Sequence, residues 1–165
     1  HTSYLDVILS YIVIPTYFHF MGKYELAKVP LFGIFFKNMD IAVNRASRMD
    51  SHKAFVRAGS DIEKNISIVM FPEGTISADT PKMSRFKSGP FKLAISKQVP
   101  IVPVTFKNNW KILRDERYGA FGGNPGIARI VIHPPIPTKG LTDDDVDTLQ
   151  QQVDKVIENE LTYAY

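Results

Sequence analysis

The spacing of apolar residues changes along the chain and divides it into alternating strands and helices. The clearest strand runs from Ile66 to Phe71, where an apolar run rich in β-branched residues ends at Pro72 and Gly74. Such a run is typical of a strand that is buried on both faces. Shorter apolar segments predict further strands at 17–20, 41–43, 101–106 and 128–133, of which the last two should also be buried.

Apolar residues at helical spacing lie between these strands. A first helix should begin near Tyr4, because Ser3 before it and Asp6 in its first turn have the form of a capping box. This helix is expected to turn four residues inward, namely Leu5, Ile8, Leu9 and Ile12. Three more helices are predicted at 50–64, 90–97 and 143–161. The apolar face of the last helix consists of Val146, Leu149, Val153, Val156 and Ile157.

The alternation of strands and helices predicts an α/β fold, with one layered domain over residues 1–165 and a largely parallel central sheet flanked by helices. A chain of 165 residues with 44% hydrophobic residues suits one such domain with a sizeable core. In sheets of this kind, the residues just beyond the carboxyl ends of the strands tend to form the site.

Composition narrows the kinds of site that are possible. The chain has no cysteine, which excludes disulfides and cysteine-based sites and fits a reducing compartment. The longest charge-free run, 7–22, is 16 residues long, whereas a helix that spans a bilayer needs about 20. Because the chain begins at His1 without a methionine or a signal peptide, we expect a trimmed N-terminus.

Charge is distributed unevenly around a formal net charge of +3. Residues 141–165 hold seven acidic residues and one lysine. Residues 82–114, here called the basic stretch, hold eight cationic side chains and no acidic one. The basic stretch favours an anionic partner, although a solvated basic face accounts for it equally well.

His1 and Asp6 form the pattern H-x4-D, which suits a general base and the carboxylate that orients it. Five residues along a regular helix turn through about 500°, so the two side chains cannot share a helical face. They can meet only if His1 lies in the loop before the helix and Asp6 lies in its first turn. A surface histidine followed by an N-terminal capping aspartate is the alternative that this pattern alone leaves open.

Two further segments follow or form strands in a way that suggests a site. Phe71-Pro72-Glu73-Gly74-Thr75 places a carboxylate and a hydroxyl at the end of the best strand, and Gly74 permits close approach of the backbone to a ligand. A structural turn is the alternative. In Val99-Pro100-Ile101-Val102-Pro103-Val104, a proline interrupts a strand, which places that strand at a sheet edge or gives it a shaping role.

Three cationic residues, Lys23, Arg45 and Lys87, could each hold a phosphate, although each could also be ordinary surface. The chain lacks a Walker A motif, a G-x-G-x-x-G motif, H-E-x-x-H and G-x-S-x-G. Nucleotide hydrolysis, dinucleotide redox chemistry, zinc proteolysis and α/β-hydrolase chemistry therefore have no support. The four histidines show no recognisable metal-ligand spacing.

Taken in order, these segments resemble the PlsC-like glycerolipid acyltransferase family, which includes bacterial lysophosphatidate acyltransferase. H-x4-D lies at 1–6, FPEGT at 71–75 and VPIVPV at 99–104. Residues 22–26 and 86–89 are similar to two other family segments, and Arg45 stands where the family's second motif ends in arginine. Order and spacing make this resemblance, which covers residues 1 to about 105, far more specific than any single motif.

The resemblance implies a glycerol-3-phosphate acyltransferase-like fold and an enzyme of the 1-acylglycerol-3-phosphate O-acyltransferase type. Such an enzyme transfers a fatty acyl group from acyl-CoA or acyl carrier protein to the free hydroxyl of lysophosphatidate and gives phosphatidate in phospholipid biosynthesis. His1 would act as the general base and Asp6 would hold its ring. No metal, bound cofactor or nucleic acid is implied, because the acyl donor is a substrate.

The substrate-binding residues implied by the resemblance follow its motifs: Lys23 and Arg45 for the acceptor phosphate, Glu73, Gly74 and Thr75 for the glycerol end, and Lys87 for a further contact. Two departures leave the acceptor open. Met39 and Ala42 stand where the family usually has glycine and phenylalanine, and Ile76 stands where it often has arginine. Glycerol 3-phosphate or another lysolipid is an alternative acceptor, and a non-catalytic lipid-binding module is an alternative of another class.

The expected location is the cytoplasmic face of a membrane, with the protein peripheral or anchored by a segment before His1. The basic stretch would then face anionic lipid headgroups, or the phosphates and acidic helices of the acyl donor.

Overall fold

Three parallel strands form the larger sheet of the computed structural model, which describes residues 1–23, 41–44, 47–77, 79, 82–113 and 122–162. β1 (Phe18–Lys23) lies between β2 (Ile41–Val43) and β3 (Ser67–Val69). The register pairs Met21 with Ile41 and Phe18 with Ser67. The predicted strands near 17–20 and 41–43 are thereby confirmed, and both are parallel as expected.

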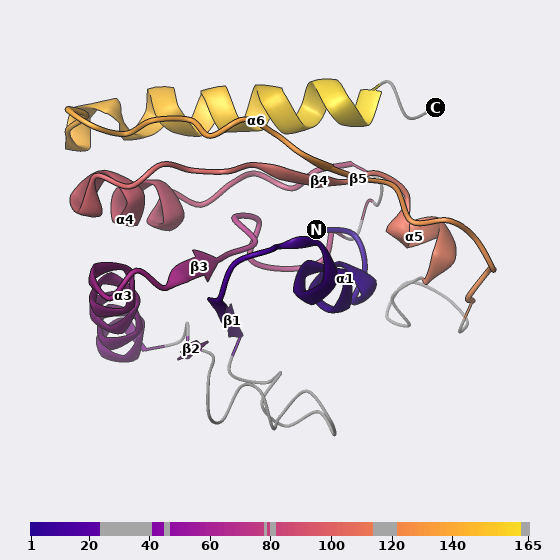
Figure 1. The fold of residues 1–165 in the computed structure, drawn as a ribbon, viewed down its shortest axis with the longest axis horizontal. Coiled ribbons are helices and arrows are strands. Elements are labelled where there is room, and N and C mark those ends of the chain that lie inside the picture. The colour runs from indigo at the N-terminus through magenta and orange to yellow at the C-terminus, as the bar shows by residue number, and fades with distance from the viewer. Residues whose placement is uncertain (24–40, 45–46, 78, 80–81, 114–121, 163–165) are drawn as a thin grey trace.

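Helices cover this sheet and link it to a second layer. Those before the second sheet are α1 (Leu5–Val13), α3 (Arg48–Glu63) and α4 (Gly89–Lys97). The short α5 (Asn109–Ile112) lies in the chain between the two strands of that sheet, and the 3-10 turn η3 (Asp143–Asp145) and α6 (Val146–Thr162) follow it. In Figure 1, α6 lies on one side of α4, and the parallel sheet with α1 and α3 lies on the other. The predicted α/β fold, a parallel sheet flanked by helices, is confirmed.

The strands expected at 101–106 and 128–133 form a separate antiparallel pair. β4 (Val104–Phe106) pairs with β5 (Ile130–Ile132), and Thr105 lies opposite Val131. Pro103 lies before β4 and accepts a hydrogen bond from the His133 main chain at 2.9 Å. Because proline cannot donate to a ladder, the regular pairing begins only after it. Since β4 pairs with β5 alone in the described sheets, the predicted edge position of Pro103 is confirmed.

Buried apolar residues form three clusters, one for each contact between layers. The α6 cluster joins Leu149 and Val153 to Phe91 and Ile95 of α4. A second cluster lies between α3 and the β1–β2 edge, and a third joins Val7 of α1 to Phe18 and Phe20 of β1. The apolar face predicted for the last helix is confirmed, because its five residues all pack into the α6 cluster.

The sequence-based predictions of burial are wrong for α1, β3 and β5. In β5, Ile130 and Val131 are half-buried and Ile132 is 48% exposed. α1 buries Asp6, Val7 and Ser10, whereas Ile8 and Ile12 are 42% and 73% exposed. The Asp6 carboxylate turns inward and accepts a hydrogen bond from the Asn109 side chain, and the buried Ser10 hydroxyl donates to the Asp6 carbonyl within the helix, so neither is buried without a partner.

β3 was also predicted to be buried, but its three residues are exposed or half-buried. It pairs with β1 on one side only and is therefore an edge of the described sheet. Along the parts of the chain that the structure describes, no helix combines the length and apolarity that crossing a membrane requires.

Candidate active site

His1 and Asp6 meet at the start of α1, in the way that the H-x4-D spacing required. The His1 ring nitrogen Nδ1 lies 2.9 Å from Asp6 Oδ2. His1 precedes the helix and Asp6 occupies its first turn. Ser3 holds the loop between them, since its main-chain nitrogen donates to Asp6 Oδ2 at 3.1 Å and its hydroxyl accepts from Leu5 at 3.1 Å. The predicted bond between Asp6 and the Ser3 main chain is present, although the N-cap residue is Tyr4, which makes no side-chain cap bond.

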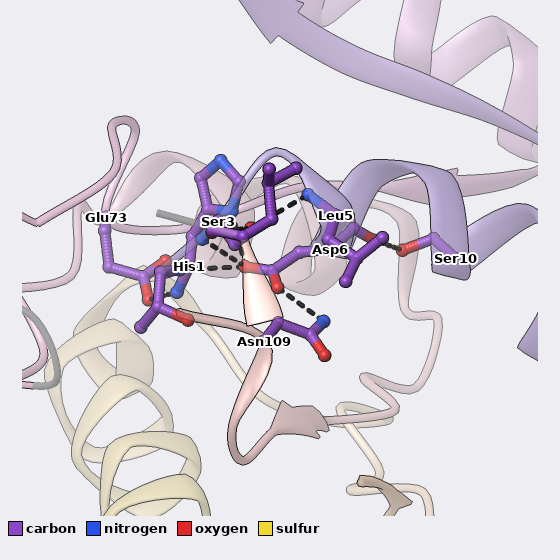
Figure 2. Close-up of polar contacts among 9 residues, drawn as sticks. His1, Ser3, Leu5, Asp6, Ser10, Glu73 and Asn109 are labelled. Atoms are coloured by element: carbon purple, nitrogen blue, oxygen red, sulfur yellow. Dashed lines mark hydrogen bonds and ion pairs between the residues drawn. The ribbon is translucent and has the colours of Figure 1, made fainter. Parts of the chain in front are cut away.

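The Asp6 carboxylate is fully buried and has hydrogen bonds on both oxygens. Oδ2 accepts from His1 and from the main chain of Thr2 and Ser3, and Oδ1 accepts from the Asn109 side-chain amide at 2.8 Å. Figure 2 shows the carboxylate between His1 and Asn109. Burial raises the pKa of Asp6 above its ordinary value, and hydrogen bonds from Thr2, Asn109 and Ser3 act in the opposite direction. These donors stabilise the charged Asp6 carboxylate, which accepts the hydrogen bond from the imidazole.

The FPEGT segment forms the wall beside His1. The Phe71 ring stacks on the imidazole, with centroids 3.9 Å apart and an interplanar angle of 14°. Glu73 is buried, and its Oε1 accepts a hydrogen bond from the main-chain nitrogen of His1 at 2.6 Å. The FPEGT segment thus contacts a histidine 70 residues earlier in the chain in two ways, one apolar and one polar.

The remaining FPEGT residues form a tight turn at the same edge. Gly74 has a φ of +74°, a conformation that glycine adopts without strain, and its main-chain nitrogen donates to Phe71 at 3.0 Å. Thr75 is exposed. The exposed Lys87 is tied to the turn through its main-chain nitrogen, which donates to Pro72 at 2.9 Å. The structure thus brings Glu73, Gly74 and Lys87 to one turn.

Two predicted phosphate-binding residues are not placed at the site by the structure. Lys23 ends β1, and its side chain lies outside what the structure describes. Arg45 lies outside the described residues altogether. Within the basic stretch, Lys97 pairs with Glu63 and Lys107 pairs with Glu160, so two of its charges support the fold. Lys82, Arg85 and Lys92 are exposed, as is Lys87.

Three buried side-chain atoms have no hydrogen-bond partner among the described residues, and all three belong to residues that contact the His1–Asp6 pair or adjoin it. They are Thr2 Oγ1, Glu73 Oε2 and Asn109 Oδ1. Buried polar atoms are rarely left unpaired, and exceptions gather at functional sites. The His1 nitrogen Nε2 likewise accepts or donates no hydrogen bond within the part of the chain that the structure describes. The site can therefore take a proton at Nε2 and can bind a polar molecule beside it.

Sequence reasoning missed two residues of this site. Phe71 belongs to the FPEGT motif, but nothing in the sequence indicates that its ring stacks on His1. Asn109 lies 103 residues from Asp6 and follows a strand without any motif. Its one available signal was its place just after β4, where side chains of a sheet edge gather.

Comparison with known proteins agrees with this geometry. The Acyltransferase family model matches residues 1–107, which include the His1–Asp6 pair, FPEGT and VPIVPV. A 1-acyl-sn-glycerol-3-phosphate acyltransferase of Haemophilus influenzae is 34% identical over 149 residues, 89% of this chain and 59% of that protein. An uncharacterized acyltransferase of Schizosaccharomyces pombe is 32% identical over 164 residues, 98% of this chain and 58% of that protein.

A solved structure matches as well. The crystal structure of the 1-acyl-sn-glycerophosphate acyltransferase PlsC from Thermotoga maritima superposes with a TM-score of 0.76 at 27% identity. The match covers 99% of this chain and 63% of that one. The chain thus spans about three fifths of the length of these relatives. The family match over the motifs, the shared fold and the paired His1 and Asp6 together show that the chain belongs to the acyltransferase family.

Proposed function

We propose that the protein transfers a fatty acyl group from a thioester, acyl-CoA or acyl carrier protein, to the free hydroxyl of lysophosphatidate and so forms phosphatidate. The observation that carries the proposal is the His1 imidazole, whose Nδ1 is bound by buried Asp6 and whose Nε2 is left unbonded by the described residues. A neutral imidazole held in this way is a general base. Relatives named as 1-acyl-sn-glycerol-3-phosphate acyltransferases support this acceptor.

The proposed reaction is one direct displacement. His1 Nε2 takes the proton of the acceptor hydroxyl while its oxygen attacks the thioester carbonyl. The carbon–sulfur bond then breaks, and the departing sulfur takes the proton from the imidazolium. Asp6 stabilises the imidazolium and fixes which ring nitrogen carries the proton. No covalent intermediate with the protein is required.

Polar atoms around His1 are proposed to position the acceptor. Glu73 Oε2 is buried and unpaired among the described residues, so it can accept a hydrogen bond from the glycerol portion. Gly74 and Thr75 would line the same turn. Lys23, Arg45 and Lys87 are proposed as the cations that hold the phosphate, as their place in the family motifs implies.

The test pairs an acceptor panel with a variant of the base. In the full-length protein, a labelled acyl donor is offered with lysophosphatidate, glycerol 3-phosphate and other lysolipids, and products are identified by mass. His1→Ala should lower transfer to lysophosphatidate by about 10³-fold or more while lysophosphatidate still binds. Full transfer by the variant would refute the mechanism. A preference for another acceptor would refute lysophosphatidate but leave the base in place.

We also propose that the protein works at a membrane surface on the cytoplasmic side. The support is an apolar face of α1, the helix that begins at the His1–Asp6 pair. On this face, the exposed fractions of Tyr4, Ile8, Tyr11 and Ile12 are 38%, 42%, 37% and 73%. These positions recur at helical spacing and could lie in the interfacial region of a bilayer. Ile8→Ser with Ile12→Ser should weaken binding to anionic vesicles, and unchanged binding would exclude this face as the contact.

A further inference from the structure

Asn109 lies beneath the His1–Asp6 pair and comes from a different part of the fold. It is fully buried, and its side-chain nitrogen donates to Asp6 Oδ1 at 2.8 Å. It is the first residue of α5, which follows β4 and lies in the chain between the two strands of the second sheet. Figure 2 shows its amide directed at the carboxylate from the side opposite His1.

The four donors to Asp6 are not equivalent. Three of them, His1, Thr2 and Ser3, belong to the segment that precedes α1, and all three bind Oδ2. Asn109 alone among the described donors binds Oδ1. A carboxylate held at one oxygen can still rotate about its Cβ–Cγ bond, whereas bonds at both oxygens fix its plane. Asn109 therefore determines the direction from which Oδ2 meets the imidazole.

The orientation of the Asn109 amide also depends on the charge of Asp6. A carboxylate can only accept hydrogen bonds, so the amide must present its NH2 group to it. This leaves Asn109 Oδ1 buried without a partner among the described residues, which is normally costly. The hydrogen bond from the NH2 group to Asp6 offsets this cost, because it stabilises the ionised carboxylate to which the imidazole donates its proton.

A second contact holds α5 against the same segment. The Ser3 hydroxyl donates to the Leu113 carbonyl at 2.7 Å, at the end of α5. The short helix thus contacts both the carboxylate and the loop that carries it, so the Asn109 side chain has little freedom to move away from Asp6.

We propose that Asn109 is a positioning residue of the acyl transfer site, which holds Asp6 ionised and in the plane required by His1. This inference rests on the proposed role of His1 as general base. Asn109 acts through Asp6, so its loss should lower kcat and shift the pH profile with little change in KM for either substrate.

Two variants and a matched neighbour test the proposal in the full-length protein. Asn109→Ala leaves Asp6 Oδ1 without its donor, so kcat should fall about tenfold or more. The acidic limb of the plot of kcat against pH should also move to higher pH. Asn109→Asp keeps the volume but places a second carboxylate against Asp6, so the limb should move further. Should Asn109→Ala fail to fold, the nearly isosteric Asn109→Asp still provides the test.

Asn108→Ala is the control for a merely structural role. Asn108 lies in the same turn and makes two hydrogen bonds, donating to Ile127 at 2.9 Å and accepting from the Arg129 main chain at 2.7 Å. Its loss should lower the melting temperature without moving the pH profile. Unshifted profiles in both Asn109 variants, or an equal shift in Asn108→Ala, would overturn the proposal.

A parallel His1→Ala arm separates this inference from the function on which it rests. If His1→Ala is inactive while both Asn109 variants keep the wild-type profile, only the inference fails. If His1→Ala retains full transfer, the proposed base itself is wrong and the Asn109 proposal fails with it.

Discussion

Two histidine–aspartate pairs occur among the described residues, and they lie at opposite ends of β3. The first joins His1 to Asp6 with 2.9 Å between Nδ1 and Oδ2, beside the FPEGT turn that follows the strand. The second joins His19 of β1 to Asp61 of α3 with 3.0 Å between the same atoms, near the start of the strand. Both histidine side chains are 10% exposed, so distance and exposure do not distinguish the pairs.

The pairs differ at the other ring nitrogen. His19 Nε2 lies 3.1 Å from the Tyr17 hydroxyl, so both of its nitrogens have partners. His1 Nε2 has none in the described part of the chain, and the ring is held by stacking on Phe71 instead. A histidine bound at both nitrogens is a structural connection between strand and helix, whereas one bound at a single nitrogen can take a proton from a substrate. The comparison shows that an imidazole–carboxylate pair alone does not identify a catalytic site.

The largest expected difference between the pairs is in rate. Asp6→Asn should lower kcat on the order of 10³-fold, because an amide supports the imidazolium poorly. The variant should still fold, because the Asn109 amide can turn and offer its unpaired Oδ1 to the new NH2 group. Asp61→Asn should leave kcat within about threefold and cost about 1 kcal/mol of unfolding free energy. Steady-state rates and urea unfolding of both variants provide the measurement, and a large loss of kcat in Asp61→Asn would contradict the distinction.

A smaller effect is expected from the aromatic ring beside each imidazole. Phe71→Leu removes the ring that stacks on His1 but keeps an apolar side chain, so kcat should fall about tenfold as the base is held less firmly. Tyr17→Phe is the matched control, because it removes the hydroxyl that binds His19 and should cost about 1 kcal/mol of stability without changing kcat. Rates and melting curves of the two variants separate the cases. Equal kcat values for Phe71→Leu and the wild type would show that the stack is not needed.

The two pairs also show what the sequence could predict. His1 and Asp6 are five residues apart, so a helix start alone determines whether they meet, and the capping pattern supplied that start. His19 and Asp61 are 42 residues apart and meet only because α3 packs on the sheet. Asn109 reaches Asp6 across 103 residues for the same reason. Contacts of this kind depend on tertiary packing, which local spacing does not encode.

The elements themselves were predicted more reliably than their burial. The apolar face of α6 packs as its spacing indicates, because that helix has one polar and one apolar side. α1 is apolar around most of its circumference, so hydrophobicity could not tell which face turns inward. Asp6 instead turns its face of the helix inward, where its carboxylate binds the Asn109 side chain of α5. β3 was expected to be buried on both faces because of its apolar run, but it is an edge strand of the described sheet and its residues are exposed or half-buried.

The smallest expected effect is on the pH dependence of stability. Burial raises the pKa of Asp6 above its ordinary value of 3.8, so the folded protein holds this proton more firmly than the unfolded chain does. The stability that this carboxyl contributes is therefore fully present below pH 3.8 and is lost as the pH rises through the raised pKa. Asparagine carries no such proton. The unfolding free energy of Asp6→Asn, relative to wild type, should therefore improve as the pH rises from below 3.8 to neutrality.

Urea unfolding of Asp6→Asn and the wild-type protein at a series of pH values gives this difference directly. If the difference in unfolding free energy between the two proteins is the same at every pH, the pKa of Asp6 is not raised by folding, and this prediction is wrong. If the unfolding free energy of Asp6→Asn instead improves relative to wild type as the pH rises, the ionised Asp6 carboxylate lowers the stability of the folded protein. The cost is explained if the charge is needed for the reaction at His1, because stability and activity commonly oppose each other where a site requires an unfavourable group.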